Sequence, residues 1–351
     1  MSDTEMPPPS VRKSNSLFGD IFGCTDAATA KLSCIGAGYY YDPYLHQFTT
    51  LTQSRSRLIN RGYFARIYSI LRCVSSFCKG IPGNKQVVFL GAGFDSYLFT
   101  MKEDDHPGLT LWMEVDLPEV VMKKNEIYSQ HAKRENFSRY KLISGDLLDG
   151  PGLIQSMKDG GLDPSIPTIY LLECVTAYLP PEANRSILNN ISQLHRTAAS
   201  PAMVVGYDPM SQQTDNFGKV MVANLMKRGI EMPSLMAFPT TQSREDILRE
   251  TGFDSVQAIN MKNAYMNIPP PEKARIDSIE PLDEFEEFFL LLSHYCVWIG
   301  RIFVPDTIGA GDETLSSLIP PEHFRKLLKA QKQYSPLSMA MHQFDRMGSS
   351  F

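Results

Sequence analysis

Apolar and polar residues alternate with two different periods along the chain, and these periods divide it into helical and strand-forming segments. Between residues 60 and 79, apolar side chains recur every three or four positions, at Phe64, Ile67, Leu71 and Val74. This spacing predicts an amphipathic helix, which a Pro-Gly pair then ends. Beyond it, short apolar runs alternate with helical patterns, which is typical of a mostly parallel β-sheet with helices on both faces.

Seven segments have the length and apolar content of strands: residues 86–90, 110–115, 139–143, 168–172, 202–207, 255–260 and 294–304. Helical patterns fill the intervals, at residues 117–130, 153–158, 181–196, 216–228 and 243–251. A further helix at residues 282–293 would carry the chain across the sheet, so we expect the seventh strand to enter antiparallel. These patterns predict an α/β protein with a seven-stranded Rossmann-like sheet.

The organisation around this sheet also follows from the pattern. We expect a disordered leader at residues 1–20, because this stretch is rich in Pro and Ser and lacks the apolar core of a signal peptide. A single domain should then cover residues 21–304: a helical lid at 21–80 and a sheet core at 81–304, with insertions near 208–240 and 262–282. Residues 305–351 form an appended tail to which we assign no role.

Composition narrows the class of protein. The 351 residues are 43% hydrophobic, which is enough for a real core, yet no run approaches the roughly 20 apolar residues of a membrane span. A formal charge of −5 argues against a nucleic-acid binder. The six cysteines show no C-x-x-C pair, and no histidine has metal-ligand spacing, so we expect reduced thiols and no metal. A cytoplasmic monomer is the expected state.

The first predicted strand ends in a glycine turn, Gly91-Ala92-Gly93-Phe94-Asp95, and the second ends in Asp116. Gly91 and Gly93 let the backbone approach a ligand closely, and Asp116 could accept hydrogen bonds from ribose hydroxyls. The third glycine of the dinucleotide fingerprint is replaced by Ser96. That glycine serves the packing beside a pyrophosphate, so its absence argues against NAD or FAD. The glycine turn therefore favours an adenosyl cofactor without a pyrophosphate, such as S-adenosylmethionine.

Two further acids follow predicted strands. Asp146, next to Leu147, comes after the third strand, and Glu173 ends the fourth. Ligands of open α/β sheets bind at the carboxyl ends of strands, so these acids and Asp116 should meet at one edge. Three buried carboxylates need hydrogen-bond donors, and an adenosyl ligand offers ribose hydroxyls, an adenine amine and a sulfonium. Each acid alone could equally be a solvated loop residue or a helix cap.

Arg66 lies at the border of the apolar stripe in the predicted helix, where a guanidinium needs an anionic partner such as a cofactor or substrate carboxylate. Alternatively, its stem covers the core while its head stays in water. Lys31, before the tyrosine-rich run at residues 39–44, allows the same two interpretations. Tyr178, shortly after Glu173, could place a hydroxyl in the site or fill a gap.

Several short motifs occur in an order that resembles the leucine carboxyl methyltransferases, which methylate the C-terminal leucine of the protein phosphatase 2A catalytic subunit. They are Asn60-Arg61-Gly62-Tyr63-Phe64-Ala65-Arg66, Leu90-Gly91-Ala92-Gly93-Phe94-Asp95, Glu114-Val115-Asp116-Leu117-Pro118, Gly145-Asp146-Leu147 and Glu173-Cys174-Val175, with Arg275-Ile276-Asp277-Ser278 further on. The resemblance covers residues 24–300 and not the tail.

The resemblance implies the class I S-adenosylmethionine-dependent methyltransferase fold and a protein C-terminal leucine carboxyl O-methyltransferase. It implies cofactor contacts from Lys31, Arg66, Gly91, Asp116, Asp146, Leu147 and Glu173, with Arg66 and Tyr178 near the reacting centre; Gly93 joins the cofactor set through the glycine turn. The implied partner is the phosphatase catalytic subunit, with no nucleic acid and no membrane. Two alternatives stay open: a carboxyl methyltransferase acting on a modified tRNA base or a small carboxylic acid, and a non-catalytic adenosyl-binding partner of the phosphatase.

Overall fold

The computed structural model describes residues 16–303, apart from 43, 52, 101–105, 132–137, 212–215 and 228–229. The predicted tail at 305–351 and most of the predicted leader therefore lie outside the described residues. Within the described residues, no helix combines the length and the apolar character that crossing a membrane would require.

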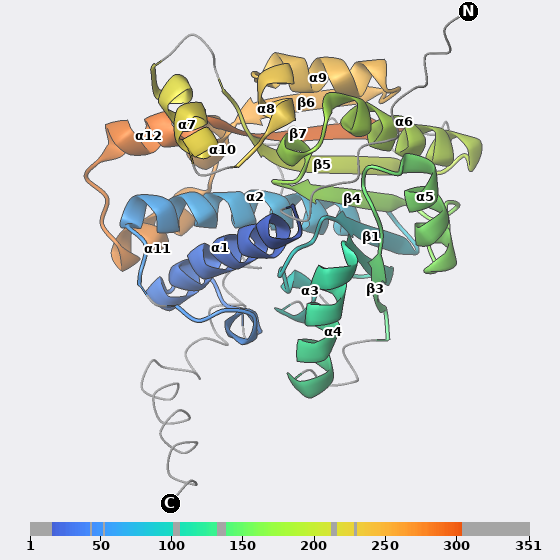
Figure 1. Ribbon diagram of the computed structural model, residues 1–351, viewed down its shortest axis with the longest axis horizontal. Coiled ribbons are helices and arrows are strands. Elements are labelled where there is room, and N and C mark those ends of the chain that lie inside the picture. Colours follow the sequence, from blue (N-terminus) through green and yellow to red (C-terminus); the bar gives the residue numbers. More distant parts are fainter. Residues whose placement is uncertain are drawn as a thin grey trace, which may run out of the picture.

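The described chain forms one seven-stranded sheet in the order β3-β2-β1-β4-β5-β7-β6 (Figure 1). The strands are β1 (Lys85–Leu90), β2 (Leu109–Asp116), β3 (Tyr140–Ser144), β4 (Thr168–Glu173), β5 (Ala202–Pro209), β6 (Ser255–Asn260) and β7 (Tyr295–Ile302). Strands β1 to β5 pair in parallel, and β7 runs antiparallel between β5 and β6. The carboxyl ends of β1, β2, β4 and β5 and the start of β7 thus share one edge.

The helices are α1 (Ser16–Ala37), α2 (Arg57–Gly80), α3 (Tyr97–Thr100), α4 (Pro118–His131), α5 (Gly150–Asp159), α6 (Pro181–Thr197), α7 (Asn216–Lys227), α8 (Pro233–Ala237), α9 (Thr241–Glu250), α10 (Met261–Met266), α11 (Pro270–Ile279) and α12 (Phe285–Ser293). Two short 3-10 helices, η1 (Leu45–Gln47) and η4 (Thr176–Tyr178), complete the set.

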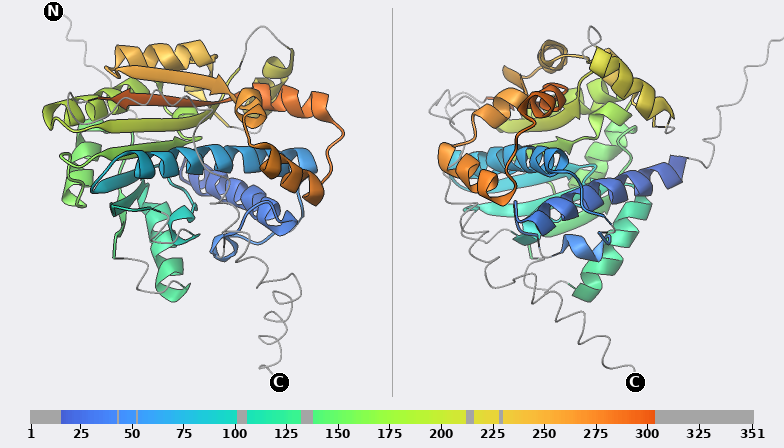
Figure 2. Two further views of the ribbon diagram at one scale, coloured as in Figure 1. Left: turned by 180° about the vertical axis from the view of Figure 1, so that it is seen from behind. Right: turned by 90° about the vertical axis from the view of Figure 1, so that its left-hand side faces the viewer.

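The sheet separates two hydrophobic cores, because successive strand residues point to opposite faces. Val87 and Phe89 of β1 pack into the core shared with α1, α2, α4, α10 and α12. Val88 and Leu90 pack into the core shared with α5, α6 and α9. The N-terminal helices α1 and α2 cover the first face side by side (Figure 2). This cover places α1 and α2 beside the strand ends that carry the predicted site residues.

The helix before the first strand is longer than predicted, beginning at Arg57 and ending at Gly80. Helix α1 begins at Ser16, so residues 16–20, which we assigned to the disordered leader, lie in a helix. Four apolar residues have helical spacing here in the sequence: Leu17, Phe18, Ile21 and Phe22. We predicted no helix because the surrounding residues are rich in Pro and Ser. The short elements α3, α8, α10, η1 and η4 were not predicted, because one or two turns give too little periodicity. The ten-residue α11 was not predicted either and lies in the expected insertion at 262–282.

Candidate active site

The glycine turn after β1 brings the backbone to the carboxylate that ends β2. Gly91 and Gly93 have φ of 69° and 50°, a left-handed conformation that favours glycine. The Gly93 N–H donates to Asp116 Oδ2 at 2.6 Å, and the Leu117 N–H donates to Oδ1 at 2.8 Å. Burial raises the pKa of Asp116, and these two backbone bonds partly offset that effect. An ionised carboxylate has about four lone-pair sites, so Asp116 keeps capacity for two more donors.

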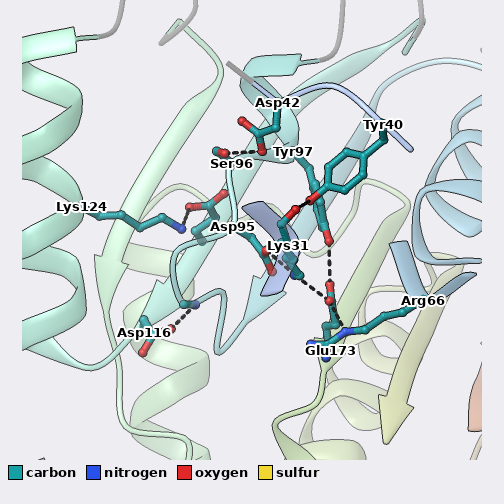
Figure 3. A network of polar contacts seen from close by, with 12 residues as sticks. Lys31, Tyr40, Asp42, Arg66, Asp95, Ser96, Tyr97, Asp116, Lys124 and Glu173 are labelled. Carbon is teal, nitrogen blue, oxygen red and sulfur yellow. Dashed lines mark hydrogen bonds and ion pairs between the residues drawn. The ribbon is translucent and has the colours of Figure 1, made fainter. Parts of the chain in front are cut away.

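A buried ion cluster lies beside this turn, where α1 and α2 meet the end of β4 (Figure 3). Lys31 Nζ donates to Glu173 Oε1 at 2.8 Å and pairs with Asp95. Arg66 Nε donates to the same Oε1 atom at 2.6 Å, and Tyr97 donates to Oε2 at 3.3 Å. Lys31 and Arg66 are therefore buried and paired, which excludes the interpretation of each as a solvated surface residue.

The two acids of this cluster differ in their electrostatics. Burial would raise the pKa of Glu173, but the charges of Lys31 and Arg66 outweigh it and lower that pKa to about 2. For Asp95, burial dominates over the attraction of Lys31, Glu173 adds repulsion, and the pKa rises to about 6. Glu173 is thus firmly ionised between two cations, while Asp95 titrates near neutral pH.

Asp146 and Leu147 follow β3 at the next position along the same edge. Asp146 is exposed, and its carboxylate accepts the N–H of Leu148 at 2.9 Å. Leu147 is buried and lies near the glycine turn, because a Cβ on Gly91 would come within 3.7 Å of its side chain. An open acceptor beside an apolar surface can receive an adenine amine and its ring.

Ser96, at the position of the missing third glycine, links the glycine turn to the N-terminal segment. Its hydroxyl donates to Asp42 Oδ2 at 2.7 Å, and both side chains are buried. Asp42 Oδ1 in turn accepts the N–H groups of Tyr44 and Leu45. This serine therefore anchors the lid instead of making room for a pyrophosphate.

Arg66 also faces several tyrosines, of which only Tyr178 was predicted as a site residue. Its guanidinium lies 4.8 Å from the ring centre of Tyr207 and 5.3 Å from that of Tyr63. Tyr295 stacks on Tyr207 with ring centres 5.6 Å apart, and Tyr178 lies within electrostatic range of Arg66. Within the described chain, the hydroxyls of these four tyrosines and both terminal nitrogens of Arg66 make no hydrogen bond. They form a set of donors available to an anion.

The structure thus gathers the predicted residues into two adjoining groups. Gly91, Gly93, Asp116, Asp146 and Leu147 border one group, and Lys31, Arg66 and Glu173 form the other. Protein groups already supply part of the donors that these carboxylates need: Lys31, Arg66 and Tyr97 bind Glu173, and backbone N–H groups bind Asp116 and Asp146.

Asp95, Tyr97, Tyr207 and Tyr295 were not among the predicted site residues. Asp95 stands two positions after the second glycine of the turn, and this position in the sequence could have identified it as a site residue. Tyr207 and Tyr295 come from the end of β5 and the start of β7, and only the antiparallel pairing of these strands brings them together. Among the described residues, no group of His, Cys, Asp or Glu is placed to hold a metal ion.

The strand order with an antiparallel seventh strand, the glycine turn and the acid after β2 define a class I methyltransferase whose cofactor is S-adenosylmethionine. Comparison with known proteins identifies the family. The family model described as leucine carboxyl methyltransferase matches residues 15–192. The chain therefore belongs to the leucine carboxyl methyltransferase family, and it is a carboxyl methyltransferase.

The individual relatives agree with this family. A leucine carboxyl methyltransferase 1 homolog from Arabidopsis thaliana is 33% identical over 290 residues, covering 78% of this chain and 86% of the relative. Leucine carboxyl methyltransferase 1 from Schizosaccharomyces pombe is 33% identical over 288 residues, covering 78% and 91%. The human tRNA wybutosine-synthesizing protein 4 is 29% identical over 294 residues, covering 77% of this chain but 42% of the relative.

Proposed function

We propose that this enzyme transfers the methyl group of S-adenosylmethionine to the C-terminal leucine carboxylate of the protein phosphatase 2A catalytic subunit. The resulting methyl ester would regulate assembly of the phosphatase. The observation that carries the proposal is the cluster of tyrosines around the Arg66 guanidinium, in a chain of the leucine carboxyl methyltransferase family. A cytoplasmic location and a monomeric state stay predictions from the sequence.

The residues near the glycine turn fit the cofactor. Asp116 keeps two acceptor sites for the ribose hydroxyls, and Asp146 offers an open acceptor for the adenine amine beside Leu147. Glu173 would balance the positive charge of the amino acid part, and Lys31 and Arg66 would face its carboxylate. The bound cofactor supplies an electrophilic methyl group on a sulfonium, and all other requirements fall on the protein.

The acceptor needs no general base, because a C-terminal carboxylate with a pKa of about 3.3–3.7 is already ionised at neutral pH. The enzyme must instead remove water from the carboxylate and hold it in line for transfer. The terminal nitrogens of Arg66 can bind one carboxylate oxygen, and the tyrosine hydroxyls can orient the other. Charge is neutralised as the ester forms, which a dry aromatic surrounding favours.

The proposal is tested by comparing a phosphatase with a free C-terminal leucine, which should be methylated, and one with a blocked C-terminus, which should not. The enzyme is incubated with isotope-labelled S-adenosylmethionine and the phosphatase catalytic subunit, either with its free C-terminal leucine or with that terminus amidated. Mass spectrometry of the C-terminal peptide should find one added methyl group on the free terminus alone, because amidation removes the charge and the attacking oxygen but keeps the side chain.

The same experiment weighs the alternative acceptors. A panel of small carboxylic acids and carboxyl-bearing tRNA is incubated in parallel with the same labelled cofactor. Methylation of these, without any on the phosphatase, would contradict the proposal and favour the activity suggested by the similarity to the tRNA wybutosine-synthesizing protein.

A further inference from the structure

The short helix η4, which carries Tyr178, is held from behind by a buried acid. Asp208, at the end of β5, is fully buried. Its carboxylate accepts the hydroxyl of Thr176 at 2.6 Å and the N–H of Ala177 at 3.1 Å, the first two residues of η4. The indole N–H of Trp298 in β7 donates to the same carboxylate at 2.9 Å. The sheet thus fixes the start of η4 through side-chain hydrogen bonds.

Arg244 of α9 completes this network. It is buried, and its Nη1 donates to the Thr176 hydroxyl at 3.0 Å and lies 3.8 Å from Asp208 Oδ2. Its Nε and Nη2 atoms are buried without a hydrogen-bond partner among the described residues, next to a small cavity that Thr176, Asn184 and Trp298 also line. The Thr176 hydroxyl is therefore the link between the guanidinium and the carboxylate.

A second pair of side chains, Asn184 and Ser234, binds the carbonyls at the start of η4 and just after its end. Asn184 of α6 donates through Nδ2 to the Thr176 carbonyl at 2.8 Å and to the Ser234 hydroxyl at 2.8 Å. Ser234 of α8 donates to the carbonyl of Leu179, just after η4, at 2.6 Å. Elements that lie far apart in sequence therefore converge on four consecutive residues, 176–179.

The segment so held has a conformation that it would not adopt alone. Cys174, between Glu173 and η4, has a φ of 56°, which is rare for a residue other than glycine. Such a conformation persists where the surroundings over-determine it, and it concentrates at functional sites. Tyr178 is 45% exposed on the same segment, although η4 is otherwise buried.

We infer that the Asp208–Thr176–Arg244 network, together with Asn184 and Ser234, is a positioning device that fixes Tyr178 on the acceptor side of the active site. None of these five residues is bonded to Asp116, Lys31 or Arg66, so we expect the device to affect acceptor binding far more than cofactor binding. The inference rests on the proposed function, because the phosphatase tail is the acceptor it concerns.

The test compares Thr176→Val, which keeps the shape but removes the hydroxyl, with Thr176→Ser, which keeps the hydroxyl. Steady-state kinetics with the phosphatase gives KM for the acceptor, and isothermal titration gives Kd for S-adenosylmethionine. We expect Thr176→Val to raise the acceptor KM or to lower kcat by about tenfold to a hundredfold, as small misplacements of a positioning group do. Kd for the cofactor should stay within about twofold of the wild type, and Thr176→Ser should restore the activity.

A double-mutant cycle with Tyr178→Ala separates positioning from general destabilisation. If Thr176 acts through Tyr178, the loss in the double variant should equal the larger single loss, because both changes remove one function. If Thr176→Val does not fold, Ser234→Ala tests the other end of the same segment and should give the same separation of acceptor KM and cofactor Kd.

Equal losses in acceptor and cofactor binding, additive effects in the cycle, or a Tyr178→Ala variant with wild-type kinetics would overturn the inference. Failure of the proposed function is a separate result, because the wild-type enzyme would then leave the phosphatase tail unmethylated.

Discussion

Arg66 joins the two halves of the site through a single nitrogen. Its Nε donates to Glu173, while the terminal nitrogens have no partner among the described residues and face Tyr63 and Tyr207. A guanidinium can use one edge for a structural acid and another for a ligand, since its five donors have a fixed fork geometry. A lysine ammonium also has three donors, but they sit on one atom, so it cannot reproduce the two separated edges of the guanidinium.

We therefore expect Arg66→Lys to lower kcat/KM for the phosphatase by about tenfold to a hundredfold, the loss of one charged hydrogen bond of roughly 1.5–3 kcal/mol. Arg57→Lys, an exposed change in the same helix, serves as the matched control and should keep wild-type activity. Methyl-transfer rates are compared at equal folded fraction by circular dichroism. Wild-type rates in Arg66→Lys would remove Arg66 from the acceptor site.

Asp95 should make stability depend on pH. Its pKa rises from 3.8 to about 6 on folding, mainly because of burial, so between pH 4 and 6 the folded protein retains a proton that the unfolded chain has lost. The free energy of unfolding should fall across this window as the pH rises. Glu173 changes the stability in the opposite direction, because its pKa is lowered to about 2 on folding. Its contribution to the free energy of unfolding is present above about pH 4.5 and is lost as the pH falls toward 2.

The variant Asp95→Asn should remove the decrease between pH 4 and 6, which we expect to amount to roughly 1–3 kcal/mol. Urea denaturation at pH 4, 5, 6 and 7 measures it. Asp159→Asn, at an exposed position, is the control and should follow the wild-type curve. If Asp95→Asn retains the full decrease, another group carries the proton.

At the scale of elements, the helical lid is attached to the rest of the molecule by two arginines, the buried Arg61 and the half-buried Arg275. Arg61 of α2 is fully buried and donates to Asp277 of α11 at 2.5 Å, to the Tyr265 hydroxyl at 3.2 Å and to the carbonyls of Ile276 and Glu280. Arg275 of α11 donates back to the carbonyl of Tyr39 at 2.8 Å. Two motifs that the sequence shares with its family thus meet as a clasp between α2 and α11.

Removing this clasp should cost far more than removing a surface pair on the same helix. We expect Arg61→Met to lower the free energy of unfolding by roughly 2–4 kcal/mol, because buried carbonyls lose their donor. Arg57→Met breaks exposed contacts with Asp283, Glu284 and the carbonyl of Pro281, and should cost less than about 1 kcal/mol. Equilibrium denaturation gives both values, and equal costs would show that the clasp adds nothing to stability.

At this scale, long elements could be predicted from the sequence better than short ones. The strands and the helices α2, α4 and α6 were found within a few residues, because burial on one or both faces imposes a readable period. The long helix α1 was expected only as part of the helical lid. The clasp was not found, because α11 is short and the partners Arg61 and Asp277 are 216 residues apart in sequence. Sequence spacing carries no information on such a contact.

At the scale of the whole molecule, the acceptor should be recognised by more than its last residue. Enzymes use binding energy from remote surfaces to position the reacting group. We therefore expect the isolated tail peptide to be methylated with a kcat/KM at least about tenfold below that of the folded phosphatase subunit. Initial rates with both acceptors at matched concentrations measure this, with the peptide of reversed sequence as the control. Equal values would exclude docking beyond the tail but leave the chemistry intact.

The sequence by itself determined the seven-stranded parallel sheet with its antiparallel last strand, the glycine turn before Asp116 and the identity of the charged residues Lys31, Arg66 and Glu173. These features depend on local periodicity and on the positive φ that glycine tolerates, both of which can be read from neighbouring residues. Only the tertiary structure decided which charges pair. Lys31, Arg66 and Glu173 come from α1, α2 and β4, and they meet because helix packing and strand order bring them to one edge. The tyrosines around Arg66 and the network behind η4 depend on the same long-range placement, for which a linear pattern holds no signal.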